Sequence, residues 1–87
     1  MKNLVDTLSG ILREQFKPEN IKKVAGHQSG NTAYADLLDV PSENDPIWNE
    51  IKEELEFRLD KKVKTFDATE GRILSHAKDG INLWIVL

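Results

Sequence analysis

Apolar residues near the start of the chain recur at spacings of three and four, which is the pattern of an amphipathic helix. The stripe runs from Leu4 to Phe16. Asn3 is suited to cap the helix, and Pro18 forces it to end near Phe16. The pattern predicts a helix over about residues 3–16.

A second apolar stripe runs from Ile47 to Leu59 and is the clearest helical signal in the chain. Asp45 precedes it as a good N-cap, and Pro46 suits the first helical position. Carboxylates lie early in this segment and cations follow its end, as the helix dipole favours. A second helix is therefore predicted after the polar spacer 41–44.

Residues 21–40 allow two interpretations. IKKVAGHQ and TAYADLLDV can form two short strands joined by residues 29–31, or the second piece can be a short helix capped by Asn31 or Thr32. The alternation of apolar and polar residues in TAYADL favours two strands.

The last third of the chain has the composition of strands. VKTFDA, RILSHA and INLWIVL are predicted as three strands, separated by turns at residues 69–71 and at Asp79-Gly80. Asp-Gly between apolar runs is the strongest short hairpin signal. With these two residues as the loop, the expected cross-strand pairs are His76 with Leu83, Ser75 with Trp84, and Leu74 with Ile85.

INLWIVL is apolar on both faces, so we expect it inside a sheet or in an interface rather than at a half-wet edge. Something should then cover Trp84. The expected fold is a single α+β domain over residues 1–87, in which two helices pack on one face of a small, mostly antiparallel sheet in the order α-β-β-α-β-β-β. A chain of 87 residues builds only a thin core, which a partner or a second copy would help to complete.

The charge and the lack of cysteine argue against several classes of function. The net charge is −3, from 15 acidic and 12 basic residues, which argues against general nucleic-acid binding. The absence of cysteine excludes disulfides and thiolate chemistry and favours a reducing, cytoplasmic location. No run of residues has the length of a membrane span and no secretory leader is apparent, so a soluble protein without membrane contact is expected.

The stretch AGHQSGNTAY is the one place that looks like a ligand loop. A phosphate-binding P-loop needs G-x-x-x-x-G-K-[ST], and GHQSGNT has one residue too few between its glycines and Asn31 in place of the lysine. A hairpin turn is the favoured interpretation. The alternative is an exposed recognition loop of a small ligand-binding or enzymatic domain, with His27, Gln28, Asn31 and Tyr34 as contacts.

No other group of residues predicts catalysis or metal binding. The two histidines, His27 and His76, are far apart and lie in no metal-ligand spacing, and neither Ser29 nor Ser75 sits in a nucleophile motif. We therefore expect no enzymatic activity, no cofactor and no metal.

The residues expected to bind a partner lie in two segments. Glu50, Glu53 and Glu54 belong to a strip of carboxylates that is usually just a solvated helix face, but that can also dock a basic patch on another protein. Trp84 and Val86 belong to the last strand, where a partner or a second copy would cover them.

The leading hypothesis is a small protein-interaction module, such as a regulator, inhibitor or accessory subunit, that acts through its acidic helix and an apolar sheet surface. The other protein stays unidentified, and a homodimer is a further candidate. The runner-up is a nucleic-acid-binding regulator that uses a lysine cluster. Its members are Lys22, Lys23, Lys61, Lys62 and Lys64.

Overall fold

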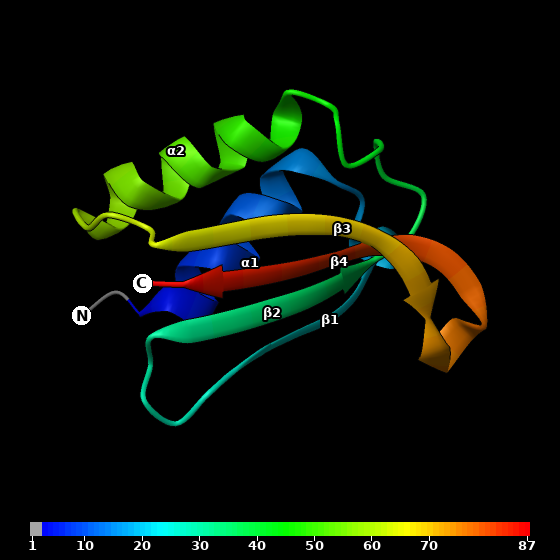
Figure 1. The fold of residues 1–87 in the computed structure, drawn as a ribbon, viewed down its shortest axis with the longest axis horizontal. Helices are drawn as coiled ribbons and strands as arrows, with labels where there is room; N and C mark the ends of the chain where they lie inside the picture. Colours follow the sequence, from blue (N-terminus) through cyan, green and yellow to red (C-terminus); the bar gives the residue numbers. More distant parts are fainter. Residues whose placement is uncertain (1–2) are drawn as a thin grey trace.

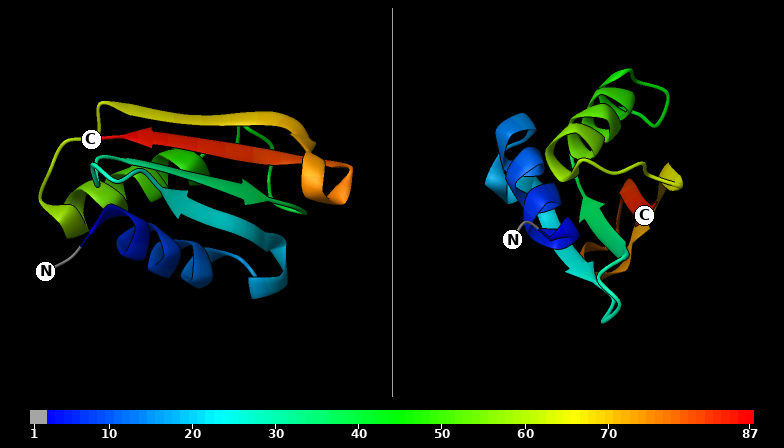
Figure 2. Two further views of the ribbon diagram at one scale, coloured as in Figure 1. Left: turned by 90° about the horizontal axis from the view of Figure 1, so that it is seen from below. Right: turned by 90° about the vertical axis from the view of Figure 1, so that its left-hand side faces the viewer.

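Two helices and a four-stranded antiparallel sheet make up the protein, as a computed structural model that describes residues 3–87 shows (Figure 1). The elements are α1 (Leu4–Gln15), β1 (Ile21–Gly26), β2 (Thr32–Leu37), α2 (Ile47–Leu59), β3 (Thr65–Ile73) and β4 (Lys78–Val86), with short 3-10 helices at Pro18–Asn20 and Leu74–His76. The strand order is β1-β2-β4-β3. Both helices lie on one face of the sheet (Figure 2), which confirms the predicted α+β class.

Both helices begin where the sequence predicts. The side chain of Asn3 accepts a hydrogen bond of 2.8 Å from the Asp6 backbone N–H and so caps α1. The Asp45 carboxylate accepts one of 2.9 Å from the Ile47 N–H, and Pro46 already has right-handed helical angles. Each cap satisfies one of the N–H groups that the first turn of a helix leaves without a partner.

The two N-terminal strands are also confirmed. β1 and β2 form an antiparallel hairpin in which Val24 lies opposite Ala35 and Ala25 opposite Tyr34. The His27 N–H donates to the Thr32 carbonyl at 3.1 Å and closes the turn, where Gly30 takes a φ of 77° that favours glycine. The helical alternative for residues 32–40 is therefore wrong.

The predicted division of the last third into three strands is wrong. β3 runs without a turn through residues 69–71, and Asp79-Gly80 lies inside β4. The chain reverses instead at the 3-10 turn Leu74–His76, after which Ala77 takes a left-handed φ of 51°.

The predicted cross-strand pairs are wrong for the same reason, because the turn sets the register of a hairpin. Trp84 lies opposite Asp67 and Ile85 opposite Phe66. Gly80 lies opposite Gly71 in the same ladder.

The core lies between the helices and the inner face of the sheet. α1 contributes Leu8 and Leu12, and α2 contributes Ile51 and Leu55, none of them more than 1% exposed. The inner positions of the two central strands are also buried, at 2% exposed or less. They are Ala33, Ala35 and Leu37 in β2, and Ile81, Leu83 and Ile85 in β4. β4 is thus an inner strand, as its apolar sequence predicts.

Trp48, near the start of α2, is part of this core. Its side chain is 4% exposed, and its indole N–H donates to the Ser42 carbonyl at 2.8 Å. Its ring lies 5.6 Å from the ring of Phe16. The packing thus joins the start of α2 to the end of α1.

The segment between β2 and α2 runs along the edge strand β3. The Glu43 N–H donates to the Glu70 carboxylate at 3.3 Å, and the Glu70 N–H donates to the Glu43 carboxylate at 3.1 Å. One backbone N–H of the β3 edge is therefore already bonded.

Candidate protein-binding surfaces

The face of the sheet that points away from the helices carries no helix in residues 3–87 (Figure 2). The pairing register places the side chains of this face in rows that cross the four strands. The central row is Ala25, Tyr34, Trp84 and Asp67, and the next row is Lys23, Asp36, Asn82 and Thr69. We call these eight residues, with Thr32, Val86 and Thr65 of the row beyond, the open sheet face.

Tyr34 and Trp84 stack at the centre of the open sheet face. Their ring centroids are 6.2 Å apart and their planes are inclined by 17°. The Lys23 ammonium lies 5.4 Å from the centroid of the Tyr34 ring. Because β1 and β4 flank β2, the lysine and the tryptophan approach Tyr34 from its two sides, and the three side chains form a ridge across the sheet.

Trp84 is 44% exposed although it sits on an inner strand. Its neighbour Val86 on the same face is half-buried. The structure thus leaves Trp84 without the cover that its sequence context led us to expect.

The polar groups of the open sheet face surround the ridge. Asn82 donates a hydrogen bond of 2.7 Å to Asp36, so that carboxylate already has a partner. Lys23 and Asp67 are exposed and lie on the two outer strands, β1 and β3.

The second candidate surface is the outward side of α2. Glu50 and Glu53 are exposed there. Between them on the helical wheel lies Phe57, whose side chain is 79% exposed. The sequence analysis did not single out Phe57. Its position two residues from both Leu55 and Leu59 places it on the opposite side of the helix from the apolar stripe, and that position already predicts an exposed side chain.

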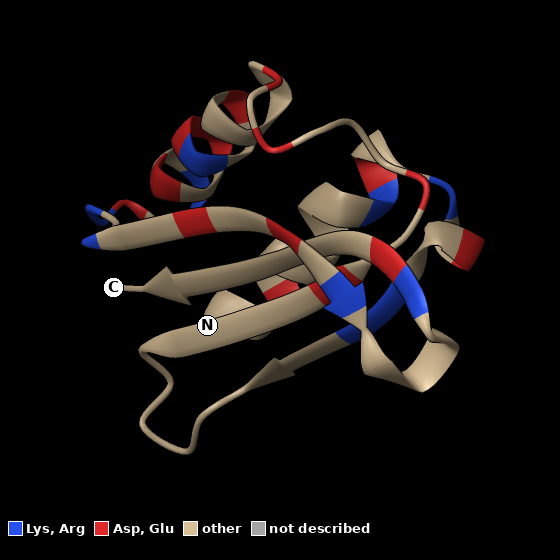
Figure 3. Cartoon of the chain, turned by 45° about the vertical axis from the view of Figure 1, so that its right-hand side comes forward, with Lys and Arg blue, Asp and Glu red and all other residues tan. Residues whose placement is uncertain are grey.

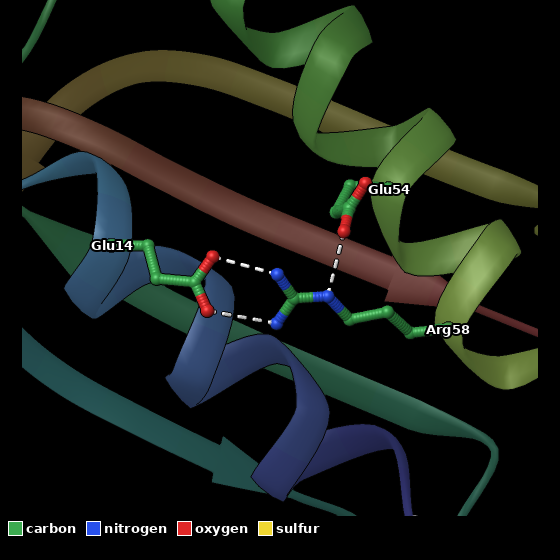
Figure 4. A network of polar contacts seen from close by, with 3 residues as sticks. All are labelled: Glu14, Glu54 and Arg58. Carbon is green, nitrogen blue, oxygen red and sulfur yellow. Dashed lines mark hydrogen bonds and ion pairs between the residues drawn. The ribbon is translucent and has the colours of Figure 1, made fainter.

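Glu54, the third predicted carboxylate, lies at the border between the helices and is engaged in an ion-pair network (Figure 4). Arg58 Nε donates to Glu54 at 2.8 Å, and the two terminal nitrogens of Arg58 donate to both oxygens of Glu14 in α1 at 2.6 and 3.0 Å. The hydrogen bonds from Arg58 lower the pKa of Glu14 below its ordinary value, and the carboxylates raise the pKa of Arg58. Arg58 therefore links α2 to α1, and Glu54, which is bonded to Arg58, is less available to a partner than Glu50 and Glu53.

The two candidate surfaces face opposite sides of the molecule. α2 belongs to the helical layer, and the open sheet face is the other side of the sheet (Figure 2). One flat partner surface therefore cannot contact both. The acidic helix and the apolar sheet surface, which the sequence suggested as the interacting parts, are thus two separate surfaces.

The predicted lysine cluster does not form. Lys22 and Lys23 lie on β1 and Lys61, Lys62 and Lys64 lead into β3, and these strands are the two opposite edges of the sheet. Because β1 and β3 also run in opposite directions, the two groups lie at opposite ends of the molecule (Figure 3). These five lysines therefore do not form one basic patch for a nucleic acid.

The residues of the predicted recognition loop divide between two places. His27, Gln28 and Asn31 are exposed in the β1–β2 turn, where the His27 ring lies 3.4 Å from the Ser29 hydroxyl. Tyr34 belongs to the ridge on β2 instead. The Asn31 carbonyl accepts a hydrogen bond of 2.8 Å from the Leu87 N–H, which ties the turn to the end of the chain. These contacts are those of a structured hairpin turn.

A shallow depression of about 550 Å³ lies between the segment after β2 and the β3–β4 hairpin, and its titratable groups are the carboxylates of Asp39, Glu70 and Asp79. Across residues 3–87 no group of three or more His, Asp or Glu side chains is arranged to hold a metal ion. Neither α1 nor α2 has the length and apolar character of a membrane-spanning helix.

Comparisons with models of protein families, with curated proteins and with solved structures find no match for this chain.

Proposed function

We propose that the protein is a non-enzymatic interaction module that binds another polypeptide through its open sheet face. The observation that carries the proposal is the exposure of Trp84, 44% on an inner strand, in a stack with Tyr34. A large aromatic side chain that a small domain leaves accessible is the residue type that anchors protein interfaces. Burial of its exposed part in a partner would supply the cover that the chain itself does not provide.

The composition of the face supports a polypeptide as the ligand. Its centre is aromatic, its surroundings are threonine, asparagine and alanine, and its fixed charges have both signs. A binding surface for a nucleic acid would instead collect positive charge around its aromatic side chains. An apolar centre with a polar rim is the ordinary anatomy of a protein interface.

Site-specific photo-crosslinking tests the proposal. A benzophenone amino acid is placed at Trp84 in one variant and at Leu74 in another, and each is irradiated in cells that express the protein. Leu74 is 86% exposed but lies in the β3–β4 turn, so it controls for apolar exposure alone. We expect a discrete protein adduct from position 84 and none from position 74. Equal labelling at both positions, or none at position 84, would contradict the proposal.

A second candidate function uses the outward side of α2. Phe57 stands exposed beside Glu53 and Glu50, a combination that suits a basic surface with an apolar pocket. A benzophenone at position 57 tests it in the same experiment. Adducts from position 57 that Glu50→Lys and Glu53→Lys abolish would support this function, and adducts that survive both reversals would contradict it.

A further inference from the structure

We infer that the hollow between α1 and the outer strand β1 binds a phosphate group, either as inorganic phosphate or as a phosphate monoester. The hollow has a volume of about 270 Å³ and is lined by Ser9 and Arg13 of α1 and by residues 21–24 of β1. α1 runs beside β1 at this edge of the sheet (Figure 2). This site is separate from the open sheet face, so the inference goes beyond the proposed binding of a polypeptide.

The hollow collects positive charge in a chain whose net charge is −3. Arg13, Lys22 and Lys23 line it, and no carboxylate among residues 3–87 does. The ion pairs found within residues 3–87 both belong to Arg58, so none of the three cations is held by a carboxylate. An anionic ligand would therefore meet positive charge that has no partner within the domain.

A β-bulge brings Lys22 to this place. Ile21 lies opposite Leu37 and Lys23 opposite Asp36, so Lys22 is an extra residue without a partner on β2. In a regular strand two consecutive side chains lie on opposite faces of the sheet. The bulge breaks this alternation, and two consecutive lysines can then line the same hollow.

Lys23 contributes less charge to the hollow than Arg13 and Lys22. Asp36 lies opposite Lys23 on β2 and stays ionised when the Asn82 amide donates to it, so it offsets the charge of Lys23. The Lys23 ammonium also lies 5.4 Å from the centroid of the Tyr34 ring. The binding of an anion is therefore expected to depend mainly on Arg13 and Lys22.

Three further carboxylates belong to the neighbouring segments but do not line the hollow. Asp6 precedes Arg13 by two turns of α1, which is about 10 Å along the helix axis, and it accepts a hydrogen bond from the Asn3 amide. Glu14 is bonded to Arg58 on the side of α1 that contacts α2. Glu19 is exposed in the short helix Pro18–Asn20.

Uncharged donors complete the site. Ser9 precedes Arg13 by four residues, so both side chains lie on the same side of α1. The His27 N–H donates to the Thr32 carbonyl, and bonded pairs alternate with non-bonded pairs along an antiparallel ladder. The Val24 N–H consequently points away from β2 at the outer edge of the sheet, where it can donate to a ligand.

These donors suit a phosphate monoester. A monoester carries a charge of about −1.5 to −2 at pH 7 and three acceptor oxygens, which matches a guanidinium, an ammonium, a hydroxyl and a backbone N–H. Pockets for larger organic ligands begin at about 300 Å³, so the hollow fits a small anionic group. The contacts are few and open to solvent, so we expect a dissociation constant on the order of 1 mM.

An NMR titration of the ¹⁵N-labelled chain at pH 7.5 tests the inference. Inorganic phosphate replaces sodium chloride at constant ionic strength up to about 20 mM, well above this dissociation constant. The amide signal of Val24 and the Nε–H signal of Arg13 should shift and reach saturation. Arg13→Gln and Lys22→Gln should each weaken binding by about fivefold or more, because each removes a charge that contacts the ligand.

Matched controls separate contact in the hollow from a general effect of net charge. Lys17→Gln and Lys61→Gln remove the same charge at exposed positions that do not line the hollow. Both should leave the dissociation constant unchanged to within about twofold. Circular dichroism verifies the fold of each variant, and exposed Arg13 gives a test that does not disturb the core.

Two further titrations distinguish the sources of the phosphate. Phosphoserine should bind within about threefold of inorganic phosphate, since it presents the same dianion. A single-stranded oligonucleotide, at the same concentration of phosphate groups, should bind no more tightly, because a nucleic-acid backbone needs a row of cations and not one hollow.

The inference is overturned by shifts that rise linearly up to the highest phosphate concentration without saturation. It is also overturned if Lys17→Gln weakens binding as much as Arg13→Gln, because the effect then comes from net charge. Tighter binding of the oligonucleotide than of phosphoserine would replace the monoester with a nucleic acid and overturn the assignment of the ligand.

Discussion

Gly80 lies against Leu37, and the carbonyl oxygen of Leu37 occupies the place that a side chain at position 80 would take. Cδ2 of Leu38 and Cγ1 of Ile73 would lie only 2.8 and 2.9 Å from an added Cβ. Glycine is therefore required here for the close approach of β4 to the end of β2, and not for a turn.

Gly80→Ala should lower the free energy of unfolding by about 2–3 kcal/mol, because the backbone and two buried side chains must shift to admit a methyl group. Urea denaturation measures the effect. Gly71→Ala is the matched control, since Gly71 lies opposite Gly80 and its added Cβ would meet nothing within 4 Å. The control should change stability by less than about 1 kcal/mol. Equal effects at the two positions would refute the close packing at Leu37.

The two tryptophans should respond differently to substitution. Trp48→Ala should cost about 3–5 kcal/mol, because a side chain that is 4% exposed leaves a cavity and frees the Ser42 carbonyl. Trp84→Ala should cost about 1 kcal/mol, mostly through the lost stack with Tyr34.

Acrylamide quenching of the single-tryptophan variants Trp48→Phe and Trp84→Phe, at low micromolar protein concentration or below, checks the assignment. The emission of Trp84 should be quenched strongly and that of Trp48 weakly. Similar quenching of both would show that the open sheet face is covered within one chain.

The ion pair between the helices should make stability depend on pH. The pKa of Glu14 in the folded protein lies below its ordinary value of 4.5, because Arg58 donates two hydrogen bonds to the carboxylate. The folded state thus holds this proton less tightly than the unfolded state. Its contribution to stability is complete above the ordinary pKa and is lost as the pH falls through the lowered one.

Thermal melts of the wild type and Glu14→Gln at pH 7 and pH 3 test this. The variant should melt below the wild type at pH 7, and the difference should shrink at pH 3. Glu19→Gln, at an exposed glutamate of the short helix Pro18–Asn20, is the control and should show no such convergence. If the difference in melting temperature between the wild type and Glu14→Gln is the same at both pH values, the effect of the substitution comes from packing and not from charge.

Phe57 should contribute little to folding despite its size. Phe57→Ala should change the unfolding free energy by less than about 0.5 kcal/mol, as is usual for exposed positions. Leu55→Ala, two residues earlier and 0% exposed, should cost about 2–5 kcal/mol. A large loss on replacing Phe57 would mean that this side chain packs within the domain, and it would remove the second candidate surface.

Local signals in the sequence identify most of the fold. Both helices follow from their apolar stripes and caps, with Asn3 and Asp45 acting as their residue types suggest. The N-terminal hairpin follows from alternation and from a glycine at positive φ. Each of these signals lies within the segment that it predicts, so the segment can be predicted without knowledge of its tertiary contacts.

The error at Asp79-Gly80 has a different origin. Glycine is selected both by turns and by close approach of backbone, and the sequence near Gly80 does not distinguish the two cases. The deciding contact is with Leu37, on a strand that is far away in the chain. The turn at Leu74–His76 places Ala77 at a φ of 51°, where alanine is an unusual choice, and so gave little local signal.

The candidate site was likewise predictable only where a local sequence pattern indicates it. A last strand that is apolar on both faces singled out Trp84 as a side chain in need of cover, and Phe57 could have been found from its place off the helical stripe. The stack of Tyr34 on Trp84 requires the pairing of β2 with β4, which no local pattern encodes.

The paired glutamates Glu43 and Glu70 have a consequence for how copies of the chain can grow into larger assemblies. An edge strand of 9 residues is long enough to template another strand and to start an open-ended fibre. The Glu43 carboxylate already occupies the Glu70 N–H on β3, and two negative side chains stand at that point. The opposite edge, β1, is interrupted by a bulge between Ile21 and Lys23. The addition of a strand from another molecule is therefore unfavourable at both edges of the sheet, which favours closed assemblies over polymers.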